Sequence, residues 1–82
     1  MTRDELRRII LEEICNIAPE ADLAGLGDED DVREALDLDS MDIFNLVVAL
    51  SQRLGVDIPD ADAGQLVMLG TAVDYLADRA GN

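Results

Sequence analysis

Ser40 is the residue whose type and position most suggest chemistry. It is one of two serines and lies in the run Leu38–Asp39–Ser40–Met41–Asp42, where an acidic loop meets the start of a predicted helix. A phosphate ester on its hydroxyl would face unpaired helix N–H groups and the positive end of the helix dipole. The hydroxyl would also point to solvent, where another enzyme could modify it. The alternative is that Ser40 serves only as the N-cap of that helix.

The chain contains no base that could turn Ser40 into a nucleophile. It has no histidine, and its six basic residues are all arginine. These absences exclude a Ser-His-Asp triad, a P-loop lysine and a Schiff base. One cysteine without histidine also excludes a structural zinc site and an internal disulfide. We therefore predict that the protein is not an enzyme and that a separate enzyme would have to modify Ser40.

Acidic residues dominate the 82-residue chain, with 19 Asp and Glu against six arginines and a formal net charge of −13. Calcium-loop registers that begin at Asp28 and Asp37 place Arg33 and Asp42 at the sixth position, where a glycine is needed. We predict no dedicated metal site, and a metal-binding acidic module is disfavoured. The charge also repels phosphate backbones, so we expect no nucleic-acid partner and favour partners with basic surfaces.

Apolar residues at spacings of three and four predict an all-α fold. Helices are expected at about residues 3–17, 40–54, 60–66 and 71–80. The first has a capping-box pattern, Thr2 to Glu5, and ends before Pro19. Cys15 lies within it and has no basic neighbour to activate its thiol, so we predict a buried structural thiol.

The helix at 40–54 should begin with Ser40 as its N-cap and end at Gly55 as its C′ residue. Its apolar face is predicted to comprise Met41, Phe44, Val47, Val48 and Leu54, widened by Leu46 and Leu50. The last two helices are bounded by turn signals. Asp60 opens the short third helix, and both Asp60 and Asp62 are expected to be solvated residues at its start. Gly70 precedes the last helix, in which Thr71 to Asp74 form a weak capping pattern and which Gly81 closes.

Residues 19–38 form a long acidic loop with one possible helical turn at 31–36. Its apolar anchors are Leu23, Leu26, Val32 and Leu36. A connection of this length in so short a chain is typically functional or mobile, or a solvated loop held by its leucines. The N-terminus has no signal-peptide pattern and no 18-residue apolar run occurs, so we expect one domain spanning residues 1–82, a cytoplasmic monomer and no membrane insertion.

These motifs resemble the acyl carrier protein family, four-helix domains that bear phosphopantetheine. The match comprises Asp-Ser-Met-Asp at 39–42, with Met in the family's Leu position, Leu-Val-Val-Ala-Leu at 46–50, Val-Asp-Ile-Pro-Asp at 56–60 and Ala-Val-Asp-Tyr-Leu at 72–76. The resemblance implies that a separate phosphopantetheinyl transferase moves 4′-phosphopantetheine from coenzyme A onto Ser40, with Asp39 helping in its recognition. The thiol of the arm would then carry acyl groups as thioesters between an acyl-activating ligase and an acyltransferase or synthase.

The sequence departs from the family pattern around this motif. Leu38 replaces a small residue, and neutral or basic residues stand where the second helix usually carries glutamates: Asn45, Ser51, Gln52 and Arg53. We therefore predict a specialised carrier, for a lipid or secondary-metabolite pathway, that docks on basic or apolar partner surfaces through Asp37, Met41, Asp42 and Asn45. An aminoacyl or peptidyl carrier and an unmodified docking or regulatory subunit remain open alternatives.

Overall fold

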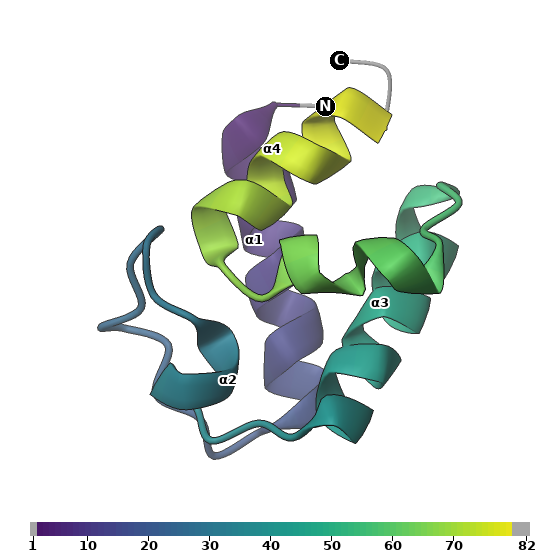
Figure 1. Ribbon diagram of the computed structural model, residues 1–82. Coiled ribbons are helices and arrows are strands. Elements are labelled where there is room, and N and C mark those ends of the chain that lie inside the picture. The colour runs from purple at the N-terminus through teal and green to yellow at the C-terminus, as the bar shows by residue number, and fades with distance from the viewer. Residues whose placement is uncertain (1, 80–82) are drawn as a thin grey trace.

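The computed structural model describes residues 2–79, and helices form its regular structure apart from one isolated bridge between Asp31 and Met68. The elements in chain order are α1 (Arg3–Ile17), α2 (Val32–Ala35), α3 (Ser40–Leu54), a 3-10 helix η1 (Asp60–Leu66) and α4 (Leu69–Arg79). α1 packs against both α3 and α4, and η1 runs between those two helices across the face shown in Figure 1. The predicted all-α helical bundle is confirmed.

The helix ends follow the chemistry of the local sequence. Thr2 Oγ1 accepts a hydrogen bond of 3.1 Å from the N–H of Glu5, which is the Thr half of the expected capping box. α1 ends where Pro19 disfavours helical geometry for the residue before it. Gly55 adopts the left-handed conformation, with φ of 66°, and terminates α3 as predicted.

Only part of the predicted apolar face of α3 enters the core, namely Leu46, Val47 and Leu50. Its buried residues are spaced as one helical stripe: Ile43, Leu46, Val47 and Leu50. Met41, Phe44 and Val48, which we assigned to the apolar face, are exposed. α3 carries apolar residues on several sides, so periodicity alone does not determine which stripe faces α1.

The prediction of a buried Cys15 is also wrong, because this side chain is exposed. The core stripe of α1 contains Leu6, Ile10 and Ile14. Cys15 follows Ile14 by one position, which turns it about 100° around the helix and away from the core. The core itself is almost entirely aliphatic, with Tyr75 as its one buried aromatic residue within 2–79.

The long acidic loop is held against the body of the protein. Leu26 and Val32 are buried, and Leu23 and Leu36 pack against the core, as expected. The predicted turn at 31–36 is the helix α2, with Asp31 as its N-cap. Two backbone hydrogen bonds join the loop to the start of α4. The N–H of Val32 donates to the carbonyl of Val67 at 2.7 Å, and the N–H of Gly70 donates to the carbonyl of Asp28 at 2.9 Å.

α4 begins at Leu69, two residues before the predicted start. Gly70 therefore lies inside the helix and does not precede it. A Cβ atom at Gly70 would come within 3.0 Å of the Asp28 Cβ atom. This close approach by the loop explains the glycine. Thr71 therefore lies within the helix and not at a cap. The predicted end at Ala80 and Gly81 lies outside the described residues.

Asp62 has a structural role that the sequence did not indicate. η1 has the predicted bounds but is a 3-10 helix, and Asp62 is not simply a solvated residue. Its Oδ2 accepts hydrogen bonds from the Tyr75 hydroxyl at 2.6 Å and from Arg79 Nη2 at 3.1 Å. The Arg79 guanidinium also lies over the Tyr75 ring, 4.9 Å from its centroid. Asp62 thus ties η1 to α4.

Candidate functional site

Ser40 is the first helical residue of α3 and is not its N-cap. The N-cap is Asp39, whose Oδ1 accepts a 2.9 Å hydrogen bond from the N–H of Asp42. Asp42 Oδ2 in turn accepts a 3.2 Å bond from the N–H of Asp39. Both Asp and Ser are good caps, but Asp39 has the extended backbone of a cap and a matching partner three residues later. Our N-cap prediction is therefore wrong by one residue, and Ser40 is exposed and not required for capping.

The segment that leads into Ser40 is fixed by its backbone and by one buried side chain. Asp37 has a left-handed backbone, with φ of 56°, which turns the chain after α2. The N–H of Leu38 then donates a 2.9 Å hydrogen bond to the carbonyl of Arg33. Leu38, which replaces the small residue of the family pattern, is only 9% exposed and belongs to the core. Its burial anchors the chain two residues before Ser40.

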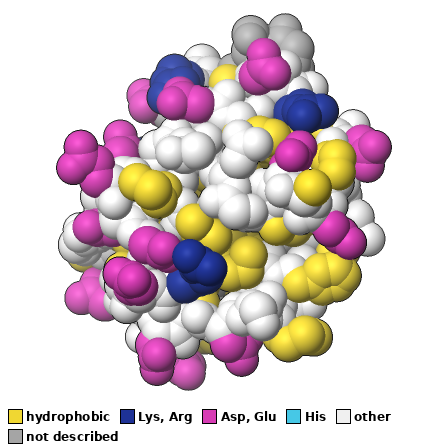
Figure 2. All heavy atoms as spheres, in the orientation of Figure 1, with side chains coloured by type: hydrophobic (Ala, Val, Ile, Leu, Met, Phe, Trp, Pro, Cys, Tyr) yellow, Lys and Arg dark blue, Asp and Glu magenta, His cyan; other side chains and the backbone are white. Residues whose placement is uncertain are grey.

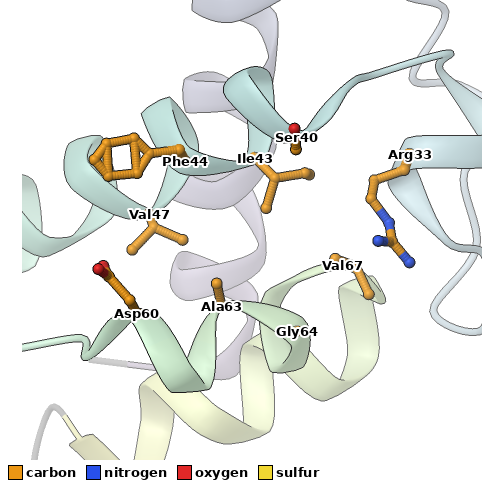
Figure 3. A pocket seen from close by; sticks show the side chains of 9 residues that line it. All are labelled: Arg33, Ser40, Ile43, Phe44, Val47, Asp60, Ala63, Gly64 and Val67. Carbon is orange, nitrogen blue, oxygen red and sulfur yellow. The ribbon is translucent and has the colours of Figure 1, made fainter.

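A pocket of about 300 Å³ lies between α3 and η1 with Ser40 on its border (Figure 3). Its apolar walls come from Ile43, Val47, Ala63 and Val67. Polar groups stand at its two ends, Arg33 near Ser40 and Asp60 at the far end. In Figure 3 the Ser40 hydroxyl points away from the pocket, and Ser40 is exposed. The complete lining comprises Arg33, Ser40, Ile43, Phe44, Val47, Asp60, Ala63, Gly64 and Val67.

An exposed apolar stripe on α3 begins next to Ser40. Met41 is 64% exposed, Phe44 47% and Val48 39%, at spacings that place them along one side of the helix. Figure 2 shows hydrophobic side chains gathered over α3 and around the hollow between α3 and η1. Sequence analysis assigned Phe44 to the core. The signal for its exposure was Ile43, which was not assigned to the apolar face but extends Leu46, Val47 and Leu50 into a stripe with core spacing.

The predicted docking residues do not all share this stripe. Met41 lies in it, and Asn45 is exposed beside it on α3. Asp42 is half-buried and engaged in the capping pair, while Asp37 is exposed in the turn before Ser40.

Arg53, the cation near the end of α3, is bound to α1. Its Nη2 donates to Glu12 Oε1 at 2.6 Å and its Nη1 to Glu13 Oε2 at 3.0 Å. The bonds to Glu13 and Glu12 raise the pKa of Arg53, which therefore stays charged. The residue links two helices and offers a partner little free positive charge.

Within residues 2–79, no three His, Cys, Asp or Glu side chains are grouped so that they could hold a metal ion. In the same part of the chain, no helix has the length and apolar character to cross a membrane.

An exposed serine at a helix start, beside an apolar pocket, is an arrangement that can carry a group on a side chain. A family model described as a phosphopantetheine attachment site matches residues 4–76. An acyl carrier protein of Campylobacter fetus subsp. fetus is 33% identical over 73 residues, which cover 89% of this chain and 88% of that protein. The chain therefore belongs to the acyl carrier protein family.

Solved structures agree with this assignment. The structure of an acyl carrier protein from Enterococcus faecalis aligns with a TM-score of 0.79 and 28% identity, covering 96% of this chain and 99% of that one. A structure from Anaplasma phagocytophilum aligns with a TM-score of 0.85 over 100% of this chain and 96% of that one; at 23% identity it supports the fold alone. The predicted family, phosphopantetheine cofactor and non-catalytic carrier role are confirmed.

The residues around Ser40 fit a phosphopantetheine group. Ser40 is exposed, and its hydroxyl is free of the capping role, which Asp39 fills. The adjoining pocket offers an apolar wall on both sides and polar groups at both ends. When bound, the arm supplies a thiol that holds an acyl group as a thioester.

Proposed function

We propose that Ser40 is the attachment residue and that the protein carries acyl groups on the arm bound there. The observation that best supports this proposal is the Asp39–Asp42 capping pair, which leaves the exposed Ser40 hydroxyl free between two fixed residues. In the transfer, the Ser40 oxygen loses its proton and bonds to the phosphorus of the pantetheine phosphate. The pyrophosphate bond of coenzyme A breaks, and adenosine 3′,5′-bisphosphate leaves.

Asp39 is proposed to help the transferase recognise the serine. Its carboxylate is exposed and held in one place, because it accepts the Asp42 N–H and its own N–H donates to Asp42. A fixed carboxylate next to the acceptor hydroxyl gives a basic enzyme surface a point of register.

We propose that this is a specialised carrier whose partners dock mainly through apolar contacts. Met41, Phe44 and Val48 form the stripe that supports this, and Asn45 beside them is neutral. Large exposed apolar side chains in a line mark protein interaction sites. Asp37 and Asp42 would face basic groups at the rim. The partners are expected to be an acyl-activating ligase and an acyltransferase or synthase with an apolar docking surface and basic edges.

The cargo class is left open between a fatty or hydroxy acyl group and an aminoacyl or peptidyl group. The neutral side chains of α3 are compatible with either class. Loading assays that pair the modified protein with acyl-activating and amino-acid-activating ligases would separate them. An unmodified docking or regulatory subunit is the remaining alternative, and the next experiment tests it.

The test is the intact mass of the unmodified protein after incubation with coenzyme A, magnesium and a broad-specificity phosphopantetheinyl transferase. We expect one phosphopantetheine on the wild type and none on Ser40→Ala. Ser51→Ala is the matched control, because it removes the other serine, whose hydroxyl donates to the carbonyl of Val56 at 2.5 Å; it should still be modified. Absence of modification by several transferases, with the helical fold intact, would favour the unmodified subunit.

A further inference from the structure

Arg33 is the one basic residue that lines the pocket beside Ser40 (Figure 3). Resting on the proposed attachment of phosphopantetheine to Ser40, we propose that Arg33 binds the phosphodiester that joins the arm to the protein. Arg33 is in this role a positioning residue. It holds the first part of the arm at the mouth of the pocket and takes no part in the transfer of cargo.

The immediate surroundings of Ser40 are negatively charged. Asp39 precedes it and Asp42 follows two residues later, and their carboxylates already accept the N–H groups of Asp42 and Asp39. Asp37 is exposed in the preceding turn. A phosphodiester on Ser40 adds a negative charge here, at a helix start whose donors are partly used. A nearby cation would offset the resulting repulsion.

The backbone of Arg33 is fixed close to this position. Its carbonyl accepts the 2.9 Å hydrogen bond from the N–H of Leu38, so the backbone of α2 is joined to the chain two residues before Ser40. Burial of the Leu38 side chain holds that junction in place.

The guanidinium of Arg33 is held on one side and leaves donors on the other. Its Nε and Nη2 donate to the Asp31 carboxylate at 3.3 and 3.0 Å, and these bonds raise the pKa of Arg33. The side chain is 50% exposed, and the bonds to Asp31 do not use Nη1. In Figure 3 it points toward Val67. A phosphodiester on Ser40 is expected to attract the Arg33 guanidinium toward Ser40, since guanidinium groups bind phosphate oxygens through paired N–H donors.

The other paired arginines are engaged away from the pocket. Arg53 joins α3 to α1, and Arg79 bonds to Asp62. Arg3 pairs with Asp74 and Arg7 with Asp28. None of these four lines the pocket that contains Ser40. Arg33 is therefore the cation placed to meet the arm.

The test compares wild type, Arg33→Gln and Arg33→Lys after complete conversion to the phosphopantetheine form, verified by intact mass. Arg8→Gln is the matched control, because it removes the same charge from an exposed residue of α1 outside the pocket. The readout is the 31P NMR line of the phosphodiester at low salt. We expect a narrower, shifted line in Arg33→Gln, an intermediate line in Arg33→Lys, which keeps the charge but loses the fork, and no change in Arg8→Gln.

A second measurement needs no change at Arg33 and so does not depend on the folding of the variants. The 15N signal of the Arg33 side chain is compared between the phosphopantetheine form and Ser40→Ala treated in the same way. A shift is expected. An Arg33 signal that stays in place, or a phosphorus line unchanged in folded Arg33→Gln, would overturn the proposal. Failure of Ser40 to gain the arm would appear earlier, as an unmodified mass in every variant, and would contradict the proposed function instead.

Discussion

The Tyr75 hydroxyl donates a 2.6 Å hydrogen bond to the Asp62 carboxylate and thereby joins α4 to η1, which forms one wall of the pocket beside Ser40. Asp62 also accepts from Arg79. One side of η1 is therefore bonded to α4, and its other side faces α3 across the pocket. This relationship connects the stability of the last helix with the shape of the candidate site.

Tyr75→Phe is expected to lower the free energy of unfolding by about 0.5–1.5 kcal/mol, because it removes one hydrogen bond and leaves the ring in the core. In a chain of this size, a loss of about 1 kcal/mol lowers the melting temperature by roughly 4–8 °C. Thermal melting followed by circular dichroism measures it. Asp78→Asn, a change at an exposed residue of α4, is the control. A melting temperature equal to that of wild type would contradict the role of the bond.

Stability should also fall at alkaline pH. Burial, and then the hydrogen bond to Asp62, raise the pKa of Tyr75 above its usual value of 10.0. The folded state therefore keeps the proton longer than the unfolded state, so this contribution is complete below pH 10 and is lost as the pH rises through the folded pKa. Urea unfolding between pH 8 and 11 measures the change. Tyr75→Phe should lack this part of the fall, and an equal fall in both proteins would refute the assignment.

Substitutions on α3 should separate docking from stability. Leu46→Ala removes a fully buried side chain and is expected to cost about 2–5 kcal/mol. Phe44→Ala should cost much less, because its ring is 47% exposed, yet it should slow loading or transfer by a partner enzyme. Urea unfolding measures the stability of each variant, and the rate of loading by a partner enzyme at increasing carrier concentration measures docking. A Phe44→Ala protein that loads like wild type would argue against the apolar docking stripe.

The turn before Ser40 should be sensitive to the residue at position 37. Its left-handed backbone disfavours β-branched side chains, so Asp37→Val is expected to lower the free energy of unfolding by about 1–2 kcal/mol. Asp37→Asn removes the same charge but tolerates this conformation and should stay close to wild type. Chemical unfolding of the two variants gives the comparison. Equal stabilities would show that the turn is not under conformational constraint.

Salt should stabilise the protein, because its net charge of −13 produces repulsion across a small surface. We expect the melting temperature to rise with sodium chloride and also with millimolar magnesium chloride. Differential scanning calorimetry measures both. Indifference to both salts would show that repulsion does not limit stability.

Periodicity and capping chemistry predicted the helices because both are local, whereas the attachment role of Ser40 was implied by the family resemblance. The bounds of α1, α3 and η1 follow from residues such as Thr2, Pro19 and Gly55, which act on their own neighbours. The family resemblance and the choice of Ser40 came from the same short motifs. The start of α4 was misplaced because Gly70 serves a contact with Asp28, more than 40 residues away in the chain.

The sequence by itself therefore determined the helical class, the carrier family and the serine on which the proposed function rests. Only the tertiary structure decided which stripe of α3 faces the core, and hence that Phe44 is exposed. It also decided that Asp39 caps α3, that Asp62 binds Tyr75 and that Arg33 borders the pocket. The reason is physical: propensity and capping act over one helical turn, whereas burial and side-chain pairing depend on which segments meet in space.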